Sequence, residues 1–138
     1  MLKKILVFPC CFFLLLGVYA FNDKPVFFGY AERFEIYLLN ASSTAQIVEI
    51  SEKDYKAFNG IKGESCKIQS ENFSVEKFFS EFCAEIIFEE HTAFGTSYYG
   101  FSPKIKYRKQ ILDKTVNLHI FVGESGVTVG SPIIFGSF

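Results

Sequence analysis

The strongest constraint on the fold is a series of short segments of alternating polarity in the last third of the sequence. Residues 96–101 are rich in aromatic side chains, and residues 116–122 place apolar side chains at every second position. This pattern is typical of strands with one buried face. The glycine-bounded turn at 123–126 (GESG) returns the chain into residues 127–130, before Pro132 interrupts that strand. Short turns between consecutive strands predict antiparallel pairing.

A further strand is expected just before the 116–122 segment. Ile105 and Tyr107 alternate with Lys104, Lys106 and Arg108. The spacing predicts a strand over residues 104–108 with one buried face and one solvated basic face.

The first half of the chain carries weaker versions of the same signals. Strands are predicted over residues 34–39, 46–50 and 63–69, and a short helix is expected to begin after Ser51 and end near Phe58.

The clearest helix follows Ser74, a good N-cap residue. Val75, Phe78, Phe79 and Phe82 recur at helical spacing and form one apolar stripe. From residue 84 the period changes to that of a strand. Strands outnumber helices, so the fold class predicted is α+β, a mostly antiparallel sheet with helices packed on one face.

The amino terminus resembles an export signal. Lys3 and Lys4 precede an uncharged apolar run over residues 5–18, and Ala20 follows it at a position suited to cleavage. The run is short for a membrane-spanning helix, which needs about 20 residues. We expect residues 1–20 to be a signal peptide, with an uncleaved N-terminal anchor as the alternative, and residues 21–138 to form a single domain. The protein is then secreted or held in the extracytoplasmic cell envelope.

Charge argues against nucleic acid as a partner. Residues 1–20 hold two of the 14 basic residues and none of the 15 acidic ones, so the remainder carries a net charge of −3. A weakly acidic domain lacks the positive surface that phosphate backbones require.

Two cysteines remain after the predicted cleavage, Cys66 and Cys83. In an exported protein they form either one disulfide or two free thiols that pack as small apolar groups. With His91 and His119 as the only histidines, a four-ligand metal site cannot be assembled, and no metal or cofactor is expected.

No catalytic constellation stands out. Residues 74–77 match Ser-x-x-Lys, but the companion motifs of penicillin-recognising enzymes are missing and the helix cap explains Ser74. His91 follows Glu89 and Glu90, so it is either a base held by a carboxylate or part of a solvated loop. His119 is expected to point outward from its strand, beside Asn117.

The candidate binding residues lie between residues 98 and 109. Four basic side chains follow a short aromatic segment, and we expect them to meet an envelope protein or an anionic cell-wall polymer. The alternative is a solvated strand face that protects a sheet edge. The residues are Tyr98, Tyr99, Phe101, Lys104, Lys106, Arg108 and Lys109.

Two segments resemble the YwmB family of exported proteins from Gram-positive bacteria. They are VNLHI at 116–120 followed by VTVGSPII at 127–134, and YYGFSPKI at 98–105. The resemblance covers residues 74–138 and extends to residues 21–70 only in general layout. It implies a TATA-box-binding-protein-like fold, a curved antiparallel sheet backed by helices, and no catalytic motif. The molecular function of that family is unknown, and the fold by itself implies no DNA binding.

These observations favour a non-catalytic binding module of the cell envelope. A small hydrolase acting on wall polymers through His91 or His119, and a carrier of an apolar ligand, are the alternatives. Contact with a membrane is expected only through the N-terminal segment, if it is not cleaved.

Overall fold

The computed structural model describes residues 24–38, 46–69 and 71–135 of the chain. The predicted signal peptide or anchor, residues 1–20, lies outside these ranges. Within them, no helix has the length and apolar character needed to cross a membrane.

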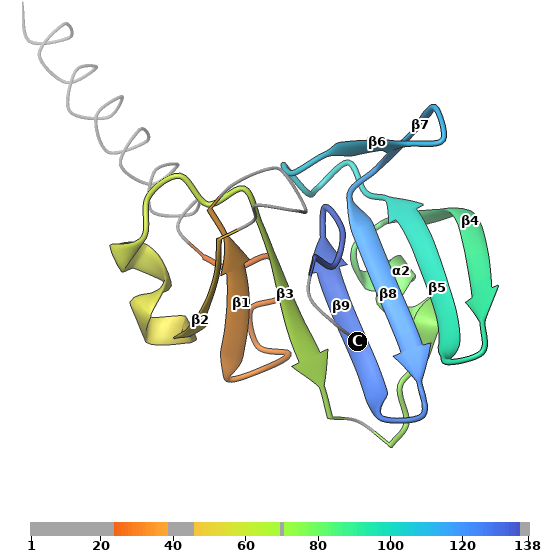
Figure 1. The fold of residues 1–138 in the computed structure, drawn as a ribbon, viewed down its shortest axis with the longest axis horizontal. Coiled ribbons are helices and arrows are strands. Elements are labelled where there is room, and N and C mark those ends of the chain that lie inside the picture. The colour runs from red at the N-terminus through yellow and green to blue at the C-terminus, as the bar shows by residue number, and fades with distance from the viewer. Residues whose placement is uncertain (1–23, 39–45, 70, 136–138) are drawn as a thin grey trace, which may run out of the picture.

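Seven strands form one antiparallel sheet in the order β2-β1-β3-β9-β8-β5-β4 (Figure 1). A separate two-stranded hairpin, β6–β7, projects beyond one end of this sheet. The mostly antiparallel α+β fold predicted from the sequence is therefore confirmed. The strands are β1 Arg33–Tyr37, β2 Ile47–Ser51, β3 Gly63–Ile68, β4 Glu85–Thr92, β5 Gly95–Phe101, β6 Lys109–Ile111, β7 Lys114–Val116, β8 Leu118–Gly123 and β9 Gly126–Ser131.

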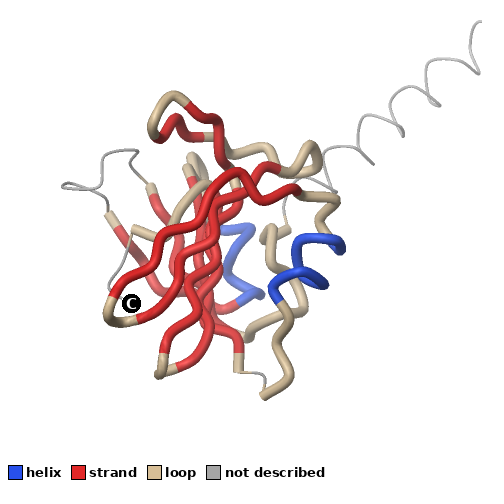
Figure 2. The backbone as a smooth tube through the Cα atoms, turned by 90° about the vertical axis from the view of Figure 1, so that its right-hand side faces the viewer, coloured by secondary structure: helices blue, strands red, loops and turns tan. Residues whose placement is uncertain are grey.

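Both helical elements lie on the same side of the sheet (Figure 2). They are the 3₁₀ helix η1, Glu52–Ala57, and the α-helix α2, Val75–Glu81. The Ser74 hydroxyl accepts a hydrogen bond from the backbone N–H of Lys77 at 3.2 Å, which confirms the predicted N-cap. We call the helix-covered side of the sheet the core face and the other side the open face.

The core lies between the core face and the helices. Phe78 and Phe79 of α2 share one apolar cluster with Leu118 and Ile120 of β8 and with Val129 of the central strand β9. Gly100 of β5 lies directly under the Phe79 ring, where any Cβ would collide with that ring and with the Glu85 carbonyl. The absence of a side chain at residue 100 therefore lets α2 sit close to the sheet.

The strand predicted over residues 104–108 is wrong, although the predicted alternation of buried and exposed side chains is correct. Ile105 and Tyr107 are buried while Lys104, Lys106 and Arg108 are exposed, but the segment is an extended loop. Its backbone pairs with a side chain. Asn117 Oδ1 accepts from the Ser102 N–H at 2.7 Å, and Asn117 Nδ2 donates to the carbonyls of Ser102 and Ile105 at 2.7 and 3.1 Å.

His119 does not point into solvent as the sequence predicted. Its side chain lies on the open face, but that face is covered here by the segment that follows β9, and His119 is 2% exposed. The backbone N–H of Ile134 donates to His119 Nδ1 at 3.1 Å, and the N–H of Phe135 donates to the Tyr37 hydroxyl at 3.2 Å. The predicted outward position of Asn117 is also wrong, because Asn117 is fully buried against the loop after β5 that it holds.

The two cysteines of the described chain are free thiols. Cys66 is buried in β3, where it packs within the apolar core, and Cys83 is exposed just after α2. The disulfide that the sequence left open is not formed.

The buried carboxyl group of Glu64 in β3 connects the segment before β1 to η1 and, through η1, to the loop before β6 by hydrogen bonds. Glu64 of β3 is fully buried, and its Oε1 accepts from the backbone N–H of Phe27 at 3.1 Å. Its Oε2 accepts from the Tyr55 hydroxyl at 2.7 Å, and the Tyr107 hydroxyl lies 3.2 Å from that of Tyr55. Burial raises the pKa of Glu64 above its ordinary value of 4.5, more than these hydrogen bonds lower it.

Replacing Glu64 with glutamine is expected to remove a pH dependence of stability. A carboxyl group whose folded pKa is raised stabilises the fold fully below pH 4.5, and this contribution is lost as the pH rises through the folded pKa. Urea unfolding of wild type and E64Q between pH 4.5 and 8 measures the effect. The stability difference should shift in favour of E64Q as the pH rises, and a constant difference would contradict the assignment.

Candidate functional site

Three stacked rings cross the open face of the sheet. Antiparallel register places His119 opposite Tyr99 and Tyr99 opposite Phe88, so the three side chains form one row over β8, β5 and β4. Ring centroids are 4.4 Å apart for Phe88 and Tyr99 and 4.3 Å apart for Tyr99 and His119, with 16° between planes in both pairs. His119 is buried at the inner end of the row, and Phe88 and Tyr99 are partly exposed.

Cationic side chains lie over the aromatic rings of this region. The Lys114 ammonium is 5.5 Å from the centroid of Phe88, and the Arg108 guanidinium is 5.3 Å from that of Phe101. The Lys109 ammonium lies 4.9 Å from the centroid of Phe135. A cation over a ring within about 6 Å is attracted by the negative face of the π system. We call this surface the cation–aromatic face: Phe88, Tyr99, Phe101, Arg108, Lys109 and Lys114.

Tyr99 of this face and His119, at the buried end of the ring row, stay uncharged near neutral pH. Burial, and secondarily the neighbouring Glu90 carboxylate, raises the pKa of Tyr99, whose hydroxyl donates to Glu90 Oε2 at 3.4 Å. Burial lowers the pKa of His119 to about 4. The face therefore presents neutral ring surfaces beside fixed positive charges.

The structure separates the predicted binding residues into two groups. In the first group, Tyr99 and Phe101 lie on the open face of β5 and Arg108 lies over the Phe101 ring, while Lys109, next along the chain, lies over the Phe135 ring. Tyr98 has the opposite orientation, because it pairs with Ile120 and packs against the core.

Lys104 and Lys106 are exposed on the loop before this face. Lys106 lies over the Tyr107 ring at 5.1 Å and is close enough to Glu64 to lower its pKa slightly. The basic cluster predicted as one strand face is therefore spread around the loop.

Sequence reasoning missed Phe88 and Lys114. Phe88 follows an irregularity in β4 between Ile86 and Phe88, where one residue is left out of the pairing with β5. Lys114 lies beyond the turn of the β6–β7 hairpin, and only the hairpin brings it back over the sheet. The position of Phe88 depends on the register of β4, and that of Lys114 depends on the hairpin; a local sequence pattern gives neither.

The two histidines do not share a site. His91 pairs with Thr96 on the core-face side of edge strand β4, whereas His119 lies on the open face. His91 Nε2 is 3.6 Å from Glu89 Oε2, but the histidine side chain is 72% exposed. A general base held by a carboxylate is therefore present only as a solvated surface pair.

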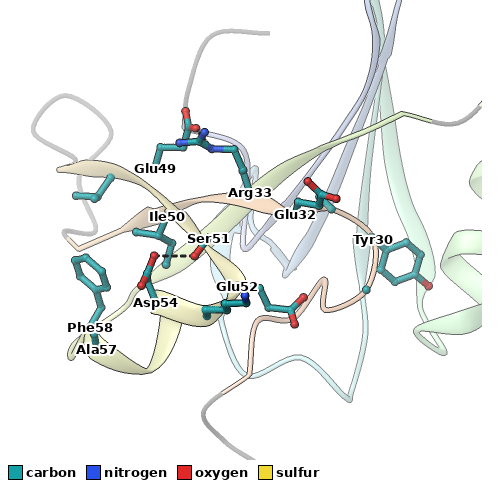
Figure 3. Close-up of a pocket in the computed structure, with 14 residues that line it drawn as sticks. Tyr30, Glu32, Arg33, Glu49, Ile50, Ser51, Glu52, Asp54, Ala57 and Phe58 are labelled. Carbon is teal, nitrogen blue, oxygen red and sulfur yellow. Dashed lines mark hydrogen bonds and ion pairs between the residues drawn. The ribbon is translucent and has the colours of Figure 1, made fainter.

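A wide groove lies at the far end of the sheet, between β1, β2 and η1 (Figure 3). It has a volume of about 1190 Å³. Several of its polar side chains satisfy one another, since Arg33 pairs with Glu49 and the Ser51 hydroxyl donates to Asp54 at 2.7 Å. Among the residues that the structure describes, no group of three or more His, Cys, Asp or Glu side chains is arranged to hold a metal ion.

No family model, curated protein or solved structure matches this chain.

Proposed function

We propose that the protein is a non-catalytic binding module of the cell envelope whose binding surface is the cation–aromatic face. The proposed partner is anionic, a cell-wall polymer or an envelope protein. Export through residues 1–20, membership of the YwmB family and a TATA-box-binding-protein-like arrangement of the sheet belong to the same proposal.

The observation that carries the proposal is the row of Phe88 and Tyr99 flanked by cations. Because the rings stack face to face, the partly exposed edges of Phe88 and Tyr99 offer apolar contact to sugar rings or apolar side chains, and the charges beside them attract phosphate or carboxylate groups. Lys114 comes from the β6–β7 hairpin and Arg108 from the loop before it, and each side chain reaches back to a ring of the sheet. Lys114 lies over Phe88 of the row and Arg108 lies over Phe101, two residues from Tyr99 along β5. Two cations placed on rings of the same sheet face favour a binding surface over the solvated strand face that was the alternative.

Reversing the charges of this face is expected to release the protein from its partner. A tagged copy of R108E/K109E/K114E, crosslinked in intact cells, should recover the partner poorly compared with wild type. Recovery of the partner by wild type should itself fall at high salt, because the distance over which exposed charges attract shrinks from about 10 Å at 0.1 M to about 3 Å at 1 M.

A matched control makes the same charge change elsewhere. Lys53, Lys56 and Lys62 are exposed on and after η1, and K53E/K56E/K62E should retain the partner as wild type does. Equal loss of partner recovery in both triple variants would show that only the net charge of the protein matters for binding, which would contradict the proposed surface. Full retention by R108E/K109E/K114E would contradict the proposed surface.

A further inference from the structure

The β6–β7 hairpin carries a leucine at a position that favours asparagine or glycine. Its two-residue turn, Leu112 and Asp113, has φ values of 50° and 61°. Turns with positive φ at both central residues are normally built from Asn, Asp or Gly, because other side chains crowd the backbone there. Asp113 suits the turn, and Leu112 does not.

Packing does not explain Leu112. The residue is 78% exposed at the tip of a hairpin that projects beyond the main sheet (Figure 1). A bulky apolar side chain held in an unfavourable conformation and in water contributes nothing to the described fold. Such positions concentrate at sites of function.

The hairpin and the loop that precedes it are rich in positive charge, although Asp113 of the turn is acidic. Residues 104–116 contain five basic residues and one acidic residue, in a chain whose net charge is −1. None of the five forms an ion pair with another residue that the structure describes. Lys109 and Lys114 lie within the hairpin itself, on either side of the turn.

We propose that this hairpin docks the protein on an anionic lipid surface. Leu112 would enter the boundary between headgroups and acyl chains, and the lysines beside it would lie among the lipid phosphates. An exposed leucine at the tip of a hairpin that carries a lysine in each strand is a combination that binds such interfaces. An acidic protein would need a pocket for the protruding leucine, whereas a lipid surface deforms around it.

This inference goes beyond the proposed function, because it needs no wall polymer or partner protein. It also differs from the expectation that only the N-terminal segment meets a membrane. Membrane contact through the hairpin can be separated from membrane contact through the N-terminal segment by a probe placed at the hairpin tip. Such a probe reports on the tip whether or not residues 1–20 are present.

The chain contains no tryptophan, so L112W introduces a single fluorophore at the tip. With vesicles of phosphatidylglycerol, its emission should shift to the blue and be quenched by lipids brominated on their acyl chains. With phosphatidylcholine vesicles, both effects should be much weaker. The control is F94W, since Phe94 is 80% exposed at the β4–β5 turn, and its emission should stay as in water.

Two further variants separate insertion of the Leu112 side chain into the lipid from adsorption of the protein through its positive charge. On the L112W background, K109Q/K114Q should weaken binding to the anionic vesicles about fivefold for each charge removed. L112N suits the turn better, so it should fold at least as well and yet lower cosedimentation with these vesicles about tenfold or more.

Three results would overturn the inference. One is L112W emission that ignores the vesicles, and another is an equal shift in F94W. The third is unchanged cosedimentation of L112N together with loss in K109Q/K114Q, which would indicate charge adsorption alone and favour an acidic polymer or peptide. Because the vesicles contain only lipid, none of these outcomes depends on the partner of the cation–aromatic face.

Discussion

Replacing Asn117 with alanine is expected to lower the free energy of unfolding by about 3 kcal/mol, because the buried amide makes three hydrogen bonds to the loop after β5. Alanine leaves one N–H and two carbonyl groups of that loop without these bonds. Each buried polar group that loses its partner costs about 1–3 kcal/mol, and water entering the gap reduces the total. Urea unfolding at neutral pH measures the loss.

The same substitution tests how the proposed binding surface is held. The loop carries Arg108, which lies over Phe101, so N117A should also weaken recovery of the partner. N72A is the control, since Asn72 is exposed before α2 and should change stability by less than about 0.5 kcal/mol. If N117A is as stable as wild type, then the amide does not hold the loop.

Lowering the pH from 6.5 to 4 is expected to remove about 3 kcal/mol of stability through His119. Burial lowers the pKa of this histidine from 6.5 to about 4, so the unfolded chain takes up a proton over this range while the folded protein does not. Stability from this residue is fully present above pH 6.5 and is lost as the pH falls through the folded pKa. Protonation would also convert Nδ1 from the acceptor of the Ile134 N–H into a donor.

H119N isolates this contribution. Asparagine keeps an acceptor near the position of Nδ1 but does not titrate, so H119N should be less stable than wild type at pH 7 and approach it as the pH falls. Glu64 acts in the opposite direction between pH 4.5 and its raised pKa, but it contributes equally to both proteins and cancels in the difference. A difference in unfolding free energy that is constant from pH 4 to 7 would contradict a neutral, buried His119.

The sequence predicted those parts of the fold that depend on local patterns. The α2 stripe, the Ser74 cap and the alternation in β8 and β9 are encoded within a few neighbouring residues, and the structure confirms them. The error at residues 104–108 has a non-local cause. Alternation correctly marked the buried side of the segment, but whether a backbone pairs with a strand or with the Asn117 amide depends on distant residues.

The position of His119 illustrates the same limit. Its alternation with Leu118 and Ile120 gave the correct face of the sheet, but a chain segment about fifteen residues later covers that face. The candidate site was predicted in part, because Tyr99, Phe101, Arg108 and Lys109 are close in sequence. Phe88 and Lys114 join them only through strand register and a hairpin.

The central claim is that the cation–aromatic face binds the partner, and radical footprinting of aromatic side chains tests it most directly. The protein is oxidised by hydroxyl radicals with and without isolated cell envelopes, and modification is measured for each ring. Phe88, Tyr99 and Phe101 should be protected in the presence of envelopes, whereas Phe28, which is 48% exposed outside this face, should be modified equally in both samples. Unchanged modification of Phe88, Tyr99 and Phe101 together with protection of Phe28 would contradict the account.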